Sequence, residues 1–492
     1  MELIWKDLEA ERLFERRTVQ VKVEGELPSP DGRSIAQIIS SGGRVYLTSA
    51  AAEADEIRLE GRIDVLITAA DGDGAAFGFE SGANFRHTIS LPGALRGMSV
   101  EAHPCIQSLT ALPKGVFASL EACVDVDLRV TDAAPMRVIG GVDGVKDLEL
   151  KTLSMAHSQR REIGGETLRL REELSAEGIS DVLSCRGLVS IRDVTVESGA
   201  AAVSGQVSVS AITLGRDGRM GQLVRSVPFR ERIAVNSPAA EAFCTAELKS
   251  LYLRSLGEDF GIAAMEAEIS FSVSKLETAS LAVPIDAFSP TIGFGCLNEH
   301  LTVSEHLGLR TLRLALQEEL PLPGGRRESV KPIFASASAV ITEAVPEGDR
   351  LAVSGVFVTE AAYEGPSGKP VTFTADIPFG AAIETPVGTN TSMLTAACVC
   401  EPKGAGENGL QAEYTLELTA ECFRESDIEA LAGLAEGETP ERTHGLAVCF
   451  ASEGEDVFDI AKRFSVPCAE VRKLNPDIAE PFCEGDKIVI LS

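Results

Sequence analysis

The stretch Leu59-Glu60-Gly61-Arg62-Ile63-Asp64-Val65-Leu66-Ile67 opens a pattern that occurs three times in the chain. Each copy has a first glycine, a second glycine 13 residues later, a phenylalanine after 24 residues and an isoleucine after 28. The copies are Gly61, Gly74, Phe85 and Ile89; Gly205, Gly218, Phe229 and Ile233; Gly355, Gly368, Phe379 and Ile383. A fixed spacing that recurs after roughly 145 residues predicts three copies of one domain-sized unit.

Residues around the first glycine of each copy alternate between apolar and polar, as Leu59, Ile63 and Val65 show. This alternation predicts a strand with one buried face. The second glycine lies among turn-forming residues, as in Asp71-Gly72-Asp73-Gly74, and predicts a turn that leaves this strand. We expect the phenylalanine and isoleucine of each copy to be buried on the next strand.

The density of such strands predicts a mainly β fold built from three tandem antiparallel β-sandwich-like units. The predicted units are residues 17–131, 166–277 and 309–423, with short helices at 34–39 and 179–183. The Gly-, Pro- and charge-rich stretches 132–165 and 278–308 are predicted to be connectors. Residues 1–16 are predicted to form an N-terminal helical segment, and the acidic stretch 424–443 is predicted to be a linker with few contacts across it.

Residues 444–492 have a different character and predict the order βααβ. A strand at Ala447–Phe450 is followed by the acidic turn Gly454-Glu455-Asp456. Val457, Ile460, Ala461 and Phe464 then form an i, i+3, i+4, i+7 apolar face, typical of a helix with acids at its N-terminus. Pro467 is suited to start a second helix, and 487–491 is predicted to be the last strand.

This C-terminal segment resembles a LysM domain. The matching residues are Gly454-Glu455-Asp456, the helix 458–464, Val466 with Leu474-Asn475-Pro476, and the terminal strand 485–490. The three preceding units resemble the SPOCS domain of spore-coat morphogenetic proteins. The matching residues are 23–27, Pro30-Asp31 and 35–39 at the start of the first unit, and Val227-Pro228-Phe229 and Ile377-Pro378-Phe379 later. The first unit departs from the last motif, with Asn84-Phe85.

The resemblance implies a binding groove between the two strand–helix loops of the LysM-like domain. LysM domains bind N-acetylglucosamine polymers there, whereas in SPOCS–LysM coat proteins the resemblance implies protein binding. The residues carried over are Glu453, Gly454, Glu455, Asp456, Val457, Asn475, Pro476, Asp477 and Ile478. The three carboxylates of the first loop would be desolvated by a neutral sugar, so this loop favours a basic protein surface. Asn475 fits a helix C-cap as well as a ligand contact.

The amino-acid composition argues against several classes of binding partner and against a disulfide framework. The formal charge of −29 argues against nucleic acid, which requires clustered Lys and Arg, and against anionic membranes. The eleven scattered cysteines predict reduced thiols rather than a disulfide framework, and no spacing predicts a zinc site. The first residues have no signal-peptide pattern, and no apolar run is long enough to span a membrane.

No set of residues predicts catalysis, a metal or a cofactor. His300 and His306 lack HExxH spacing, and the acid pairs Asp125/Asp127 and Glu413/Glu417 fit solvated strand faces better than a glycosidase pair. Together with this lack of a catalytic set, the resemblance to SPOCS and LysM domains implies a non-enzymatic scaffold of endospore coat assembly at the forespore surface, in the mother-cell cytoplasm. Its implied partner is a coat morphogenetic ATPase of the SpoIVA type. The alternatives are a cell-wall protein that binds peptidoglycan, and a LysM-targeted hydrolase.

Overall fold

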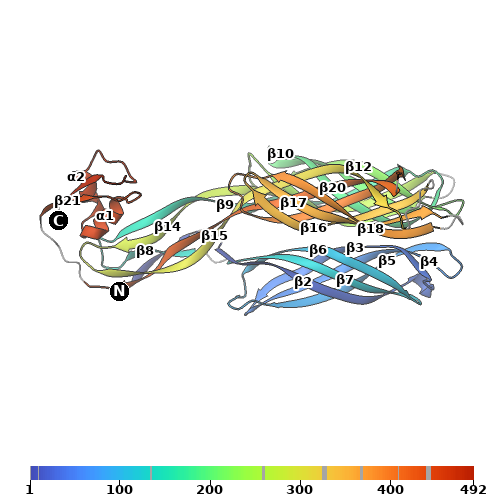
Figure 1. Cartoon of the computed structure of the whole chain (residues 1–492), viewed down its shortest axis with the longest axis horizontal. Helices are drawn as coiled ribbons and strands as arrows, with labels where there is room; N and C mark the ends of the chain where they lie inside the picture. The colour runs from blue at the N-terminus through green and yellow to red at the C-terminus, as the bar shows by residue number, and fades with distance from the viewer. Residues whose placement is uncertain are drawn as a thin grey trace.

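The computed structural model describes residues 2–8, 10, 12–132, 136–256, 261–323, 330–365, 370–407, 409–438 and 445–491. The molecule is elongated (Figure 1). Bundled long strands form a head at one end, a narrower stalk of strands leaves it, and a small helical domain lies at the far end of the stalk. The predicted mainly β fold is confirmed, and the described residues contain two short α-helices, both in the C-terminal domain.

The head contains three groups of six antiparallel strands, which we call units 1, 2 and 3. Unit 1 consists of β2 (Arg12–Pro28), β3 (Gln37–Glu53), β4 (Glu56–Ala70), β5 (Ala76–Ser90), β6 (Ser99–Lys114) and β7 (Phe117–Asp132), with a 3₁₀ turn at Pro30–Gly32. Unit 2 consists of β9 (Glu149–Ser175), β10 (Ile179–Glu197), β11 (Ala200–Gly215), β12 (Met220–Ala234), β13 (Phe243–Ser255) and β14 (Ile262–Phe288). Unit 3 consists of β15 (Phe294–Pro321), β16 (Pro332–Glu347), β17 (Arg350–Glu364), β18 (Pro370–Glu384), β19 (Thr391–Ala405) and β20 (Gly409–Glu436).

Each unit contains two sheets with the same connectivity. The second to fourth strands form one three-stranded sheet, and the fifth, sixth and first strands form the other, as in β10-β11-β12 and β13-β14-β9. A single bridge between Val303 and Arg12 joins the second sheets of units 3 and 1. The alternating apolar residues of both sheets in a unit meet in one core.

The three first glycines occupy matching positions in these sheets. Gly61, Gly205 and Gly355 lie opposite Phe85, Phe229 and Phe379 on the neighbouring strand. On the other side of each glycine the preceding strand has a β-bulge, at Thr48, Arg192 and Thr342. A Cβ on Gly355 would lie 2.3 Å from Phe379 Cζ and 2.5 Å from the Val340 carbonyl oxygen. Glycine is therefore required because the ring and the bulged backbone both cover its α-carbon.

The three phenylalanines differ in burial. Phe229 and Phe379 are buried, but Phe85 is only partly buried against the core of unit 1. Phe229 packs on Phe271 and Phe379 packs on Phe357, with ring centroids 5.5 and 4.5 Å apart. In the described residues Phe85 has no such aromatic partner. The second glycines Gly74 and Gly218 have positive φ in turns, and Gly368 lies outside the described residues.

The predicted connectors, N-terminal helix and acidic linker are wrong, because these segments form strands. Residues 1–16 contain β1 (Leu3–Leu8), which pairs with β8 (Met136–Val142) in the supposed connector 132–165. In units 2 and 3 the first and last strands simply continue beyond the head, through 149–163 and 274–288 and through 294–306 and 423–436. The part of 424–443 up to Glu436 is therefore strand; 439–443 lie outside the described residues.

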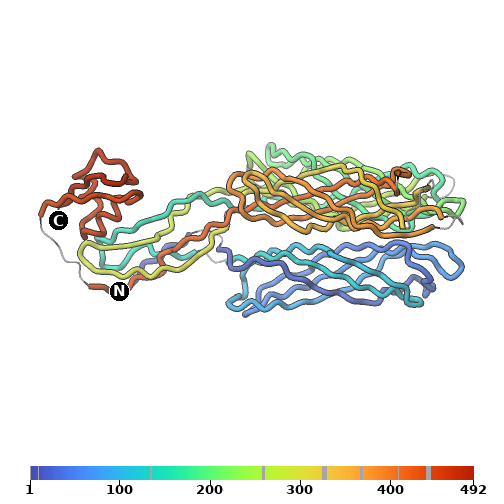
Figure 2. The backbone as a smooth tube through the Cα atoms, in the orientation of Figure 1, coloured from blue at the N-terminus to red at the C-terminus, as the bar shows by residue number. Residues whose placement is uncertain are grey.

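These extensions form three two-stranded ribbons, which together make the stalk. Figure 2 shows segments from distant parts of the chain running together there. Each ribbon turns apolar residues toward the others, in one cluster beside the head and another farther along. The first cluster contains Leu8, Met136, Val138, Leu281, Val283, Leu301, Val303, Ile428 and Ala430. A single ribbon is too thin to be stable alone, so this shared core overrides the local helix and loop preferences of the sequence.

The predicted short helices are also wrong. β3 begins at Gln37 and β10 at Ile179, where helices at 34–39 and 179–183 are expected from sequence. Both segments pair with the following strand, Ile38 with Ala69 and Ile179 with Gly215. An apolar face of one turn cannot outweigh this pairing, because an isolated helix of that length is unstable.

The units contact one another directly. Ile39, Leu183, Ile212, Phe334 and Ala362 form a buried cluster to which all three units contribute. The carboxylate of Glu360 in unit 3 accepts hydrogen bonds from Ser40 Oγ (2.7 Å) and the Ser41 amide (2.9 Å) of unit 1. The Gln222 side chain of unit 2 bonds to the Ala335 amide and carbonyl of unit 3, both at 2.9 Å. The units are thus packed side by side and fixed by polar contacts.

The glycine–phenylalanine pairs give the first testable prediction. Gly355→Ala should lower the free energy of unfolding by about 1–3 kcal/mol, because the new Cβ would overlap the Phe379 ring and a backbone carbonyl. Urea unfolding measures the change. Gly380→Ala, next to that phenylalanine, is the matched control, since nothing lies within 4 Å of its Cβ position. Equal stability of the two variants would contradict this account of the pattern.

Candidate functional site

The C-terminal domain contains β21 (Leu446–Phe450), α1 (Val457–Phe464), α2 (Cys468–Leu474) and β22 (Lys487–Leu491). β21 pairs antiparallel with β22, and the helices cover one face of this small sheet. Val457, Ile460, Ala461 and Val471 are buried between the helices and the sheet. Val457 therefore belongs to the core of the domain rather than to the groove surface.

Asp456 caps helix α1. Its side chain accepts a hydrogen bond from the Asp459 amide at 3.1 Å, and the Asp459 carboxylate accepts one from the Asp456 amide at 3.0 Å. This capping box satisfies two of the amides that a helix start leaves unpaired. Both carboxylates also contact Lys151 of β9 in the stalk, at 3.1 Å from Asp456 and 2.8 Å from Asp459.

The other residues of the first loop differ in whether their side chains contact other groups of the protein. Glu455 forms an ion pair with Arg463 and accepts a hydrogen bond from the Ser452 amide at 2.8 Å. Gly454 has a φ of +84°, which a turn of this shape requires. The Glu453 side chain is exposed. Two of the three carboxylates of this loop, Glu455 and Asp456, therefore already have a cationic partner within the protein.

In the second loop, Asn475 has a structural role. Its amide nitrogen donates to the Val471 and Val489 carbonyls at 2.7 and 2.8 Å, and its oxygen accepts from the Val489 amide at 2.8 Å. These bonds tie the end of α2 to β22 and use the side chain fully, which favours a cap over a ligand contact. Pro476 and Asp477 are exposed, and Ile478 packs partly against the domain core.

The domain is docked on the stalk by its α1 side. Phe458 packs edge-to-face on Phe288, with centroids 5.0 Å apart, and Lys462 forms an ion pair with Asp286 at 2.6 Å. The amide of Cys468 donates to Glu149 at 3.3 Å. The expectation that few contacts connect this domain to the rest is therefore wrong. The groove loops at Glu453 and Asp477 remain exposed.

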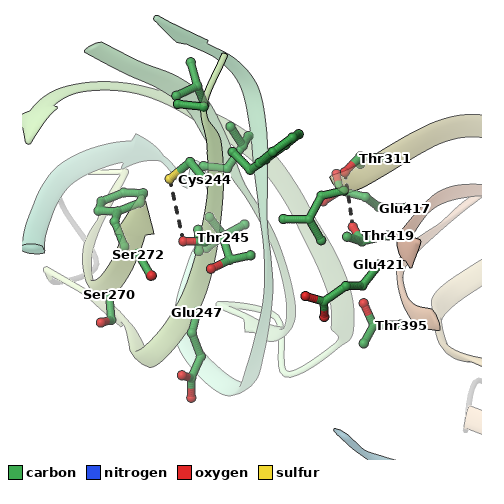
Figure 3. Close-up of a pocket in the computed structure, with 18 of the residues that line it drawn as sticks. Cys244, Thr245, Glu247, Ser270, Ser272, Thr311, Thr395, Glu417, Thr419 and Glu421 are labelled. Atoms are coloured by element: carbon green, nitrogen blue, oxygen red, sulfur yellow. Dashed lines mark hydrogen bonds between the residues drawn. The ribbon is translucent and has the colours of Figure 1, made fainter. Parts of the chain in front are cut away.

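A second candidate site lies in the head, where sequence reasoning placed none. A cavity of about 780 Å³ separates units 2 and 3. Figure 3 shows Thr245, Glu247 and Ser270 on one side and Glu417 and Glu421 on the other. The alternation of β20 predicts a solvated polar face for Glu417 but cannot show that a neighbouring unit covers it. Asp125 and Asp127 likewise lie on a polar strand face that a neighbouring unit covers, and they line an adjoining cavity.

Glu421 connects two units beside this cavity. The Gly308 amide donates to His306 Nδ1 at 2.9 Å, so His306 Nε2 carries the proton that it shares with Glu421 at 2.6 Å. Arg160 of unit 2 lies 2.9 Å from the same carboxylate. Burial acts to raise the pKa of Glu421, but the hydrogen bond from His306 and the charge of Arg160 outweigh it and lower the pKa to about 2.

The buried arginine Arg129 has a similar position between units 1 and 3. Its side chain is 2% exposed, and its guanidinium contacts Glu101 at 2.9 Å and Ser304 Oγ at 3.1 Å. It also lies over the Phe423 ring, 4.6 Å from the centroid. Arg129 and Glu421 thus place charges at the end of the head that faces the stalk, and each of these charges has an oppositely charged partner within the protein.

Comparison with known proteins gave no further guide: no family model, no curated protein and no solved structure matches the chain. Within the described residues, no group of His, Cys, Asp and Glu side chains is arranged to hold a metal ion. Neither of the described helices has the length and apolar character needed to cross a bilayer.

The Glu421 contacts predict a pH dependence of stability. A carboxyl whose folded pKa is lowered from 4.5 to about 2 stabilises the fold above pH 4.5, and this contribution disappears as pH falls toward 2. Glu421→Gln should therefore cost about 2–3 kcal/mol near pH 7 and almost nothing near pH 2. Chemical unfolding across pH measures this. Glu24→Gln, at an exposed position, is the control, and a cost that did not change with pH would contradict the assignment.

The docking contacts predict a local effect of Lys151. Lys151→Gln should weaken the attachment of the C-terminal domain by about 1 kcal/mol, since it removes the contacts to Asp456 and Asp459. Hydrogen exchange should become faster in α1 and at the start of β9 but not in the head. Lys114→Gln, in a hairpin of unit 1, is the control; unchanged exchange in α1 would show that Lys151 does not hold the domain.

Proposed function

We propose that the chain is a non-enzymatic scaffold in endospore coat assembly. In this proposal units 1–3 are copies of a SPOCS-type domain, and residues 444–492 are a LysM-type domain that docks a coat morphogenetic ATPase of the SpoIVA type at the forespore surface. The observation that carries the proposal is the joint pattern: three units with the same glycine–phenylalanine register, followed by one βααβ domain.

The position of the C-terminal domain supports a docking role. Its α1 side faces the stalk through Phe458 and Lys462, which leaves the loop residues Glu453 and Asp477 exposed. Residues 445–491 contain nine acidic side chains and five basic ones. A basic protein surface complements this charge, and the complementarity also speeds encounter.

Glycan binding by the same two loops is the alternative function. Of the two loops, Asp456 and Asn475 are occupied by internal hydrogen bonds, so neither side chain is free to bind sugar hydroxyls without rearrangement. Exposed carboxylates at Glu453 and Asp477 also lose hydration against a neutral sugar. Both features favour a protein partner over peptidoglycan.

The groove gives a direct test. Glu453→Lys combined with Asp477→Lys should weaken binding of a purified SpoIVA-type ATPase about tenfold or more, equal to about 1.4 kcal/mol, because two favourable charges become repulsive. Both residues are exposed, so the fold should be retained. Glu470→Lys, an exposed acid on α2, is the matched control. Surface plasmon resonance at two salt concentrations measures affinity and its screening.

The competing functions have distinct outcomes. Calorimetric binding of N-acetylglucosamine oligomers, with no binding of the ATPase, would replace the scaffold by a cell-wall binding protein. A lysis band in peptidoglycan zymography would replace it by a hydrolase. Binding of the ATPase by the parent and by Glu470→Lys, but not by the double variant, supports the scaffold.

A further inference from the structure

The head contains a second cavity that adjoins the first. It measures about 480 Å³ and lies between units 1 and 3. The two cavities share His103 and Thr395. We call the combined space the inter-unit trough; residues of all three units line it.

The trough is lined by strands at the ends of sheets. β6, β10, β13, β16 and β19 each have a neighbour in their sheet on one side only. The lining includes consecutive residues of these strands, such as 191–194, 243–247 and 341–344. Two of these runs contain the β-bulges at Arg192 and Thr342, and each run lies on a strand whose outer edge has no neighbour in its sheet. The trough therefore offers main-chain donors and acceptors, as edge strands do for an added strand.

The side chains in the trough are acidic or hydroxylic. Seven carboxylic acids line it against three arginines: Asp125, Asp127, Asp193, Glu247, Glu343, Glu417 and Glu421 against Arg16, Arg160 and Arg192. Threonine and serine side chains fill much of the remaining wall, including Thr245, Ser270, Thr311, Thr395 and Thr419. The excess of carboxylates favours a cationic ligand.

Glu417 is a half-buried carboxylate of the trough wall. Burial raises the pKa of its carboxyl, and contacts with Ser190 and Arg313 offset this only in part. A half-buried carboxylate whose charge is only partly compensated is stabilised by a cationic group placed beside it.

We propose that the inter-unit trough binds an extended peptide segment of a partner protein that carries Lys or Arg side chains. The edge strands bond to its main chain, and Glu247 and Glu417 accept from its cationic groups. The main-chain hydrogen bonds require an extended peptide. A free polyamine would pair with the carboxylates but could not form these hydrogen bonds with the edge strands. This site is separate from the C-terminal groove, and it stands or fails independently of the coat ATPase.

The test uses the full chain and a fluorescein-labelled peptide of alternating Lys and Val residues, with fluorescence anisotropy as readout. The parent should bind it saturably, and a peptide of alternating Glu and Val should not bind. Glu247→Gln with Glu417→Gln should weaken binding at least tenfold. The matched control is Glu172→Gln with Glu266→Gln, two exposed acids of unit 2 that do not line the trough.

A steric variant separates the trough from general charge. Thr395→Trp places a large side chain where the two cavities meet, and it should weaken peptide binding at least tenfold with unchanged thermal unfolding. If Thr395→Trp does not fold, the comparison of Glu247→Gln with Glu417→Gln against its control pair still tests the proposal. Three results would overturn the proposal: no saturable binding by the parent, equal binding by the trough and control variants, or equally strong displacement of the peptide by spermine.

Discussion

The architecture depends on long strand pairs that extend beyond the head: the first and last strands of units 2 and 3, with the separate pair β1 and β8 beside unit 1. In units 2 and 3 these strands have 27 or 28 residues, whereas the four inner strands have at most 19. Hydrogen-bonded pairing continues past the unit core and leaves a two-stranded ribbon with one apolar face. Because a lone ribbon cannot bury that face, the three ribbons must pack together. The shared stalk then forces the units to lie side by side instead of forming a string of beads.

Because the units pack side by side, strand edges and charged residues that would be exposed in a separate unit are covered by a neighbouring unit. Strand edges that would be open to aggregation in a separate unit turn toward a neighbouring unit, where they line the inter-unit trough. Charged residues at the stalk end of the head become buried, and each therefore needs a partner from another unit: Arg160 for Glu421, and Ser304 for Arg129. The same constraint thus produces both the polar contacts that fix the units and the cavity between them.

The sequence predicts features whose cause is local. The glycine–phenylalanine register follows from adjacent strands of one hairpin, and the start of α1 follows from an apolar face of helical period behind the capping residue Asp456. It does not predict the stalk, because each ribbon strand finds its partner more than 100 residues away, as Val283 pairs with Leu153. For the same reason the partner of Asp456 cannot be found from the sequence. The cation beside Asp456 is Lys151, some 300 residues earlier, and no local pattern connects the two.

The contact between Lys151 and the α1 cap also gives the C-terminal domain a defined direction. An acidic loop in a freely tethered domain would present all of its carboxylates, and any basic surface could approach from any side. Docking pairs Asp456 and Asp459 with Lys151 of the stalk, Glu455 already has Arg463 within the domain, and Glu453 and Asp477 remain on the outward loops. A partner bound there is held at a fixed angle to the stalk, and a peptide in the trough is held in the head. If both proposed sites bind a partner, the docked domain and the packed units set the distance between the two partners, which a flexible linker cannot do.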